Sequence, residues 1–226
     1  IILKHRLSAL YETFVPEYSN GFRKGRGRSD CIYALLETIR RRKQWGLESW
    51  VLLFDCVKMF DRIPRSHVWT SMRVLGVSEK MIRVIQSTLL GATGKLHVDA
   101  ELRDVLMPNG TGIGTVLGPV LCNLFLLPVL SMWIAKWNHH GTTLYTTTDR
   151  VESFTHVFAD DTCIIAQDRE SAIILGTDFT DFLLDFSIAV HMGSADNTKP
   201  KTVVIFVPPR SKDNKFETAT WPEDPL

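Results

Sequence analysis

Three aspartates in this sequence have the chemistry and the placement of a site for divalent cations. Asp55 directly follows a continuous apolar run, residues 50–54, which has the length of a buried strand. Asp160 and Asp161 stand side by side between two β-prone runs, which predicts a tight hairpin with acids at its tip. These runs are residues 154–158 and 162–166. If the first strand packs beside this hairpin, the three carboxylates converge.

Carboxylates held close together repel one another unless a cation neutralises them. Mg²⁺ binds one or two carboxylates together with substrate phosphates. Two such ions roughly 4 Å apart bind the attacking and the leaving oxygen of a phosphoryl transfer. Taken singly, an Asp-Asp pair is more often a solvated turn, and Asp55 alone would more often cap a helix. Only the combination of the three acids predicts metal-dependent phosphoryl transfer.

The remaining pattern predicts the elements that position these acids. Apolar periodicity and capping residues predict helices at 1–11, 29–43, 66–75, 78–90, 119–137 and 170–186. A further strand is expected at 202–207, a hairpin at 95–107 and a polar connection at 139–150. Pro128 is expected to bend the long apolar helix. Helices interleaved with a few strands favour an α/β or α+β layer with helices on one face of a sheet.

Length and charge are those of a globular protein with a basic front end. A chain of 226 residues suits one large domain or two small lobes. Residues 1–50 contain ten Lys or Arg against five Asp or Glu, and the rest of the chain is net acidic. This asymmetry favours a phosphate-binding lobe beside a metal-binding lobe, although charge alone fits a solvated basic surface equally well.

Cysteine usage and hydropathy indicate the compartment. The four cysteines are scattered without any CxxC pair, which argues against a disulfide framework or a zinc module and fits a reducing compartment. No apolar run reaches the roughly 20 residues that span a bilayer, and no secretory leader is recognisable. We therefore expect an intracellular protein of the nucleus or cytoplasm, not secreted and without a membrane partner. Because the chain begins at Ile1, we expect a fragment of a longer protein.

Five segments resemble, in the same order, motifs of reverse transcriptases of the non-LTR retrotransposon type. Residues 158–161, Phe-Ala-Asp-Asp, are similar to the family's (F/Y)-x-D-D turn. The other four are 21–26 (GFRKGR, with Asp30 beyond), 54–65 (FDCVKMFDRIPR), 110–125 (GTGIGTVLGPVLCNLF) and 199–206 (KPKTVVIF). Five ordered matches over about residues 5–207 make the resemblance specific.

The resemblance implies an α+β fold, with the fingers and palm of a right-hand polymerase. The palm would be an antiparallel sheet backed by helices, and the thumb would be absent. Residues 1–50 would form the N-terminal part of the fingers, and 51–65 the palm strand with the first catalytic motif. Residues 66–109 would connect fingers and palm, 110–207 would form the palm with the second and third motifs, and 208–226 a tail toward the missing thumb.

The resemblance also implies roles for single residues. Asp55 and Asp160 would be the principal ligands of two Mg²⁺ ions, with Mn²⁺ as an alternative, and Asp161 would complete the cluster. Phe60 would crowd the sugar 2′ position and select deoxynucleotides, although plain core packing is the alternative. Backbone amides from Cys56 to Phe60, including those of Val57 and Lys58, would face the triphosphate.

Further residues would contact the nucleic acid and the nucleotide. The segment from Gly114 to Pro119, with Gly118, would support the pair of template base and nucleotide, because glycine lets the backbone approach closely. Lys201 would donate a proton to pyrophosphate. Phosphate contacts in the fingers would come from Arg23, Lys24 and Arg26.

The predicted activity is RNA-directed DNA polymerisation, with an RNA template, a DNA primer and dNTPs. An RNA-dependent RNA polymerase is an alternative enzyme, against which Phe60 argues because a small residue would admit a 2′-hydroxyl. A catalytically impaired palm that only binds nucleic acid is the other, because Ile113 stands where the family has a glutamine. Asp61 is expected to be structural, in a pair with Arg65.

Overall fold

The computed structural model describes residues 1–98, 101–112, 114–137, 142–145, 150–192, 201–209 and 217–219. The helices are α1 (Ile2–Phe14), α2 (Arg28–Gln44), α3 (Met59–Arg62), α4 (Arg65–Val74), α5 (Glu79–Leu89), α6 (Gly118–Trp137) and α7 (Arg169–Asp185). The strands are β1 (Ser49–Phe54), β2 (Thr93–Val98), β3 (Glu101–Leu106), β4 (Thr142–Tyr145), β5 (Arg150–Ser153), β6 (Thr155–Phe158), β7 (Asp161–Ala166), β8 (Val203–Val207) and β9 (Glu217–Ala219).

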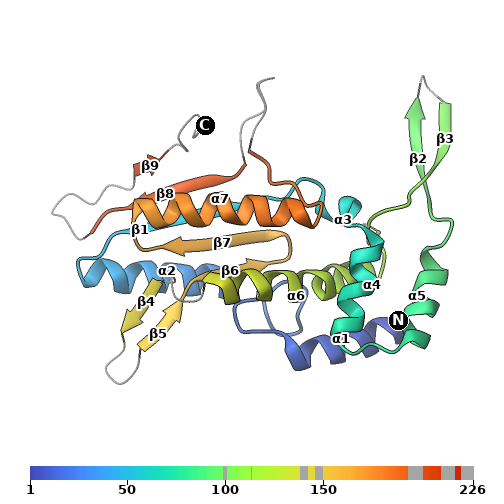
Figure 1. The fold of residues 1–226 in the computed structure, drawn as a ribbon, viewed down its shortest axis with the longest axis horizontal. Coiled ribbons are helices and arrows are strands. Elements are labelled where there is room, and N and C mark those ends of the chain that lie inside the picture. Colours follow the sequence, from blue (N-terminus) through green and yellow to red (C-terminus); the bar gives the residue numbers. More distant parts are fainter. Residues whose placement is uncertain are drawn as a thin grey trace.

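A five-stranded antiparallel sheet with the order β6-β7-β1-β8-β9 forms the centre of the fold (Figure 1). The strand β1 pairs with β7 from Trp50↔Ala166 to Phe54↔Thr162 and with β8 on its other side. The expected strand at 50–54 and the expected hairpin at 154–166 are therefore confirmed and are neighbours in one sheet. A continuous apolar run is the pattern of a strand covered on both faces, which is the situation of β1.

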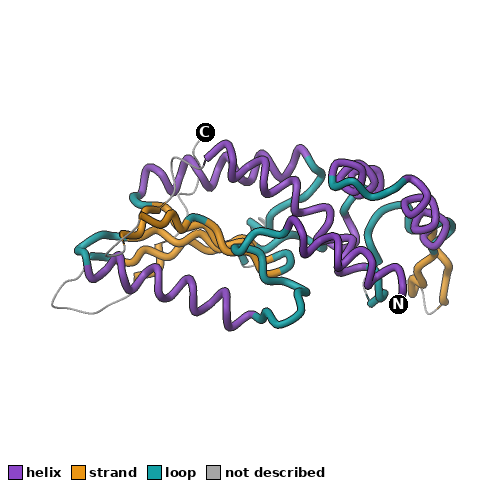
Figure 2. Tube along the Cα trace, turned by 90° about the horizontal axis from the view of Figure 1, so that it is seen from below, coloured by secondary structure: helices purple, strands orange, loops and turns teal. Residues whose placement is uncertain are grey.

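Helices cover both faces of this sheet, so the expectation of helices on one face is wrong (Figure 2). Successive side chains of a strand point to opposite faces. On one face Leu52 and Phe54 join the main core with residues of α6 and α7. On the other face Val51 forms a second cluster against α2. That cluster also contains Cys163, Ile165 and Val207, packed against Leu35, Ile39, Leu53 and Ile205.

The helix α6 is the apolar axis of the main core. Twelve of its residues are buried, and it continues through Pro128 to Trp137, so this proline does not end the helix. The helix α6 is long and apolar enough to cross a membrane, but 67% of its most apolar 18-residue stretch is buried inside the protein. A helix that is apolar all round is typical of a protein core as well as of a membrane span.

A carboxylate on α7 ties this helix to α6. Asp178 accepts hydrogen bonds from the indole N–H groups of Trp133 (2.9 Å) and Trp137 (2.6 Å) and forms an ion pair with Lys136. Phe179, the next residue, packs on Trp133 and on Phe54 of β1. The tie therefore fixes the helical layer onto the strand that leads into Asp55.

Two hairpins lie outside the central sheet. The expected hairpin at 95–107 is confirmed as β2 and β3, which extend away from the body beyond α5 (Figure 1). A second hairpin, β4 and β5, begins inside the stretch expected to be a polar connection. Its threonine-rich sequence has high β-propensity, because β-branched side chains fit a pleated surface.

Candidate active site

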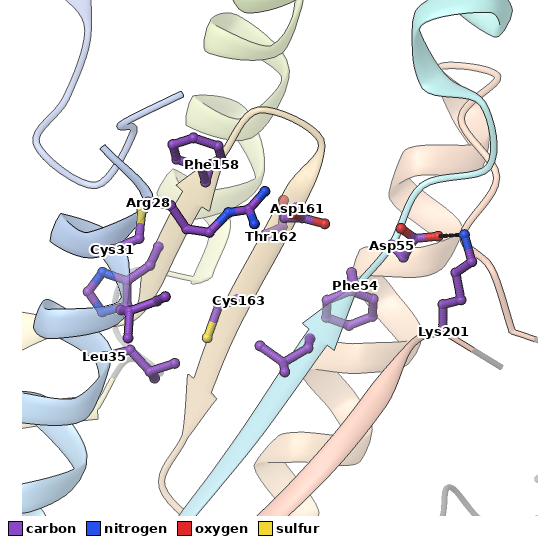
Figure 3. A pocket seen from close by; sticks show the side chains of 13 residues that line it. Arg28, Cys31, Leu35, Phe54, Asp55, Phe158, Asp161, Thr162, Cys163 and Lys201 are labelled. Carbon is purple, nitrogen blue, oxygen red and sulfur yellow. Dashed lines mark ion pairs between the residues drawn. The ribbon is translucent and has the colours of Figure 1, made fainter. Parts of the chain in front are cut away.

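The three predicted acids lie at one end of the central sheet, where β1 stops and β7 starts, and Figure 3 shows two of them, Asp55 and Asp161. The pairing of Phe54 with Thr162 places Asp55 next to Asp161. Phe158 pairs with Asp161, so Ala159 and Asp160 form the turn of the hairpin. The structure thus brings together the strand ends and the turn that carry the acids.

Asp55 and Asp161 point to the face of the sheet that α2 covers. Alternate residues of a strand share a face, so Asp55 follows Leu53 and Asp161 precedes Cys163 on that side. A cavity of about 350 Å³ lies there between the sheet and α2, lined by both acids (Figure 3). The cavity floor is apolar, and its rim at the acid end also includes Arg28 and Lys201.

The acids interact electrostatically with one another. Burial raises the pKa of Asp161 above its ordinary value, and the negative charges of Asp160 and Asp55 raise it further. Burial also raises the pKa of Cys56 to about 12, with contributions from Asp160, Asp55 and Asp161. A like charge disfavours ionisation only over a short distance. The charges of the three aspartates are therefore close enough to influence the pKa values of Asp161 and Cys56, and we refer to Asp55, Asp160 and Asp161 as the acid cluster.

Two basic side chains partly offset this cluster. The Nζ of Lys201 lies 3.6 Å from Oδ2 of Asp55 (Figure 3). Arg28 lowers the pKa of Asp161 and stacks over the ring of Phe158, 5.5 Å from the ring centroid. Lys201 was predicted from its motif, whereas Arg28 was missed, although it follows the basic GFRKGR segment by two residues. These two cations offset two of the three formal negative charges of the acids, and both lower the pKa of Asp161.

The backbone after Asp55 is held against residues 189–191. The amide of Val57 donates to the carbonyl of Ala189 (2.8 Å), and the amide of His191 donates to the carbonyl of Asp55 (2.8 Å). The Val57 amide is thus already used inside the protein and does not face a triphosphate. The predicted nucleotide contacts of Cys56 and Lys58 stay predictions. Lys58 adopts a left-handed conformation (φ 47°) that starts α3.

Phe60 lies in α3 close to the acid end. Its half-buried ring packs edge-on against Phe22, with ring centroids 6.0 Å apart. Its carbonyl accepts a hydrogen bond from the amide of Thr111 (2.8 Å). Packing and a role beside the sugar both fit this position, so the predicted selection of deoxynucleotides stays a prediction.

The glycine-rich segment before α6 docks on α3. The amide of Gly110 donates to the carbonyl of Ile63 (2.9 Å). Arg65 donates to the carbonyls of Gly110 (3.0 Å) and Leu89 (2.9 Å), so its expected pair with Asp61 is wrong. These two hydrogen bonds from one guanidinium join the start of α4 to the end of α5 and to the glycine-rich segment.

The rest of this segment turns into α6. A Cβ on Gly118 would lie 2.4 Å from the carbonyl oxygen of Gly112, so this glycine permits close approach between two backbones. Gly114 is exposed with φ +77°, and Pro119 is half-buried in the first turn of α6. The predicted contacts of Gly114, Gly118 and Pro119 stay predictions. Ile113 lies outside the described residues.

The predicted phosphate-binding residues lie in the turn before α2. Arg23 is mostly buried, pairs with Glu12 (3.0 Å) and donates to the carbonyl of Ser19 (2.8 Å). Arg26 pairs with Glu17, and Lys24 is exposed. Arg23 therefore has a structural role that competes with a phosphate contact. The phosphate contacts of all three residues stay predictions.

The sequence that contains most of this site matches a known protein family. A family model described as reverse transcriptase (RNA-dependent DNA polymerase) matches residues 1–193. The chain belongs to the reverse transcriptase family. No curated protein sequence matches it significantly.

Solved telomerases share the fold of this reverse transcriptase chain. Apo telomerase from Candida tropicalis, truncated from its C-terminal domain, superposes with a TM-score of 0.62 at 13% identity, over 95% of this chain and 45% of the telomerase. Telomerase from Candida albicans with a TWJ fragment of telomeric RNA gives 0.61 at 14%, over 88% and 35%. The corresponding RNA complex from Candida tropicalis gives 0.60 at 14%, over 91% and 32%. The chain thus spans less than half the length of each of these telomerases.

The acid cluster fits an open site for a divalent cation. Within the parts of the chain that the structure describes, no group of three His, Cys, Asp or Glu side chains, the acid cluster included, is placed so that it could hold a metal ion by itself, so no complete protein cage is present there. Mg²⁺ needs no such cage, since it binds one or two carboxylates and completes its shell with water and phosphates. The pKa of Asp161 is raised first by burial and second by the charges of Asp160 and Asp55, and these charges would attract a cation. The donor chemistry therefore suits Mg²⁺ or Mn²⁺ brought together with a triphosphate.

Gly21 and Asn123, which have no predicted role, support the turn that carries Asp160. Gly21 lies against the backbone of Ala159, and the side-chain amide of Asn123 donates to the Gly21 carbonyl (2.8 Å). Both residues fall inside motifs that resemble the family. Their mutual contact, 102 positions apart in sequence, has no signal in either motif.

Proposed function

We propose that this chain is the polymerase core of an RNA-directed DNA polymerase, which adds deoxynucleotides to a primer 3′-hydroxyl on an RNA template. The observation that carries the proposal is the meeting of Asp55 with Asp160 and Asp161 at the junction of β1 and β7. The family supports polymerase chemistry, and the electrostatic coupling of the acids supports their common role. Residues 1–50 and 66–109 would belong to the fingers and their connection, and 51–65 and 110–207 to the palm.

Asp55 and Asp160 would bind two Mg²⁺ or Mn²⁺ ions, and Asp161 would complete the cluster. Such ions lower the pKa of the attacking hydroxyl and stabilise the charge on the leaving pyrophosphate. Lys201, whose Nζ lies 3.6 Å from Oδ2 of Asp55, reaches the same space and would donate a proton to pyrophosphate. Phe60 would exclude the 2′-hydroxyl of a ribonucleotide.

The substrate side of the proposal rests on charge and on the solved relatives. Two of the similar telomerases are in complex with a fragment of telomeric RNA. In this chain Arg28 lines the cavity that Asp55 and Asp161 also line, and the exposed Lys24 and Arg26 shortly precede it in sequence, so phosphates would be attracted here. An RNA template and a DNA primer would bind across this end.

The ordered motifs support an origin in a non-LTR retrotransposon. An intracellular setting, nucleus or cytoplasm, belongs to the same proposal. It is supported by the four cysteines, which are all buried and free, since such thiols are typical of reducing compartments.

Primer extension on poly(rA)/oligo(dT) with Mg²⁺ tests the proposal. The double change Asp160→Asn and Asp161→Asn should abolish dTTP incorporation. The matched control is Asp181→Asn with Asp185→Asn, the same chemical change at two exposed acids of α7. Activity that survives the first change, or is lost equally in both, would end the assignment.

A nucleic-acid-binding palm without catalysis is the second candidate. Ile113 favours it, because isoleucine cannot form the hydrogen bonds of the family's glutamine. This candidate predicts salt-sensitive binding of the primer–template with no Mg²⁺-dependent extension by the wild type. An RNA-dependent RNA polymerase would instead incorporate rNTPs in preference to dNTPs in the same assay.

A further inference from the structure

The turn that carries the acids is in backbone contact with the N-terminal segment 18–21. A Cβ added to Gly21 would lie 2.2 Å from the backbone nitrogen of Ala159 and 2.8 Å from its Cα. Ala159 itself adopts a left-handed conformation (φ 58°), which is unfavourable for a residue with a side chain. A strained conformation persists only where the surroundings enforce it. Gly21 lies directly against this turn, with no room for a side chain between them.

Segment 18–21 also pairs with β6, the strand that leads into the turn. The amide of Val157 donates to the carbonyl of Tyr18 (2.8 Å), and the amide of Asn20 donates to the carbonyl of Val157 (2.9 Å). Ser19 and Val157 form an isolated parallel bridge. The segment therefore acts as a short additional strand at the edge of the hairpin.

Asn123 of α6 fixes this segment from behind. Its Nδ2 donates to the carbonyl of Gly21 (2.8 Å), and the residue is 5% exposed. A buried carbonyl that loses its donor has a substantial desolvation penalty. Asn123 thus joins the main-core helix to a residue that packs on Ala159.

We propose that Asn123 is a positioning residue for the acid cluster, acting through Gly21 and the Ala159 turn on Asp160 and Asp161. The amide of Asn123 holds segment 18–21 in place, and this segment supports the turn at its strained residue. Loss of the amide lets the turn move while β1, and Asp55 with it, stays in the sheet. The catalytic part of this inference rests on the proposed function, whereas the mechanical part does not.

Two variants of Asn123 separate its hydrogen bond from its volume. Asn123→Asp keeps the shape and replaces the donor by an acceptor that faces the Gly21 carbonyl. Asn123→Leu keeps the approximate volume and removes all polarity. The matched control is Asp178→Asn, which weakens the tie between α6 and α7 without touching the turn.

Hydrogen exchange of residues 155–163 without metal or substrate is the first measurement. Both Asn123 variants should raise exchange there about tenfold, the effect of losing one buried hydrogen bond on local opening. The control should lower the melting temperature and leave this segment at the wild-type rate after correction for global stability. Unchanged exchange in both Asn123 variants would overturn the proposal.

The second measurement is the Mg²⁺ concentration that half-activates primer extension. It should rise about tenfold in the Asn123 variants, the lower end of the range expected when residues that orient metal ligands are changed, with the KM for dTTP unchanged. A half-activating concentration equal to that of the control would reduce Asn123 to a merely structural residue and overturn the positioning role. Direct Mn²⁺ binding, followed by electron paramagnetic resonance, should shift in the same direction.

A wild type that neither extends primers nor binds Mn²⁺ would refute the proposed function. The exchange comparison would still decide whether Asn123 holds the turn, because it requires neither ion nor substrate. The two failures are therefore distinguishable.

Discussion

The two ends of the paired strands β1 and β7 carry charges of opposite sign. At one end Asp55, Asp160 and Asp161 gather negative charge, and the pKa of Asp161 is raised by burial and by the other two acids. At the other end lies a buried cation, Arg42 of α2, which is 4% exposed. It donates to Ser49 Oγ (2.9 Å) and to the carbonyls of Glu48 (2.6 Å) and Gln167 (3.4 Å).

This difference indicates that the Arg42 end of the two strands stabilises the fold, whereas the acid end is suited to binding a ligand. Arg42 joins the residue that starts β1 to the residue that follows β7, and its charge is solvated by protein carbonyls and a hydroxyl. Buried charge with such partners supports the fold, because each group it contacts would otherwise lose its hydrogen bond. The acid end has no comparable protein partners for all its charge, and this favours a ligand of opposite sign. Natural proteins commonly give up stability at functional sites.

Removal of Arg42 should have the largest effect on stability. Arg42→Met keeps the aliphatic stem and leaves Ser49 and two backbone carbonyls without their donor, so we expect a loss of about 3 kcal/mol in the free energy of unfolding. Urea denaturation followed by circular dichroism measures this loss. The neighbouring Arg41→Met removes a surface pair with Glu37 and should change stability by less than about 0.5 kcal/mol. Equal losses in the two variants would contradict the comparison.

The sequence predicted the acid end far better than the other end. Each of the three acids borders an apolar strand. This signal is local in the sequence and does not depend on how the rest of the chain packs. Arg42 belongs to the basic run 40–43, whose charge suits the C-terminal end of a helix and does not single out one member for burial. Burial of one arginine among four cations depends on which side of α2 meets the sheet, and that is a tertiary property.

The same limit explains the error about the layers. Ile32, Leu35, Leu36 and Ile39 have helical spacing, but only Leu35 and Ile39 pack on the sheet, while Ile32 and Leu36 are 48% and 58% exposed. Periodicity predicts the helix and one broad apolar side. It carries no information about which face of the sheet that side covers, nor about contacts such as that of Asn123 with Gly21.

The second prediction concerns the acid end and tests whether Phe60 selects deoxyribonucleotides over ribonucleotides. Phe60→Ala should lower the ratio of dTTP to UTP incorporation about 10- to 100-fold, the range expected when a steric pocket loses bulk. Phe22→Ala is the control, because it removes the ring contact with Phe60 and leaves the ring itself beside the acids. If selection of the sugar falls equally in both variants, Phe60 acts through packing alone. Steady-state incorporation with each nucleotide gives the ratio.

The pKa of Asp178 is lowered, whereas the pKa of Asp161 is raised. Burial tends to raise its pKa, but hydrogen bonds from Lys136, Trp137 and Trp133 outweigh burial and hold the pKa below 3.8. Asp178→Asn should reduce the free energy of unfolding by about 1–2 kcal/mol at neutral pH. A depressed folded-state pKa gives stability that is present above 3.8 and lost as the pH falls through the folded value. The gap between wild type and variant should therefore close below about pH 4 in urea titrations, and a gap that widens there would contradict the assigned hydrogen bonds.

Neutralising the acid end should have the smallest effect on stability, and of the opposite sign. Without metal, Asp160→Asn with Asp161→Asn removes two like charges and should raise the free energy of unfolding by about 0.5 kcal/mol near pH 7, although it abolishes the proposed activity. Because the folded-state pKa of Asp161 is raised, the folded wild type binds its proton more tightly, so this gain shrinks as the pH falls toward 3.8. Added Mg²⁺ should stabilise the wild type and not the variant. A variant less stable than the wild type without metal would show that these acids support the fold, as Arg42 does, and the contrast between the two ends of β1 and β7 would be lost.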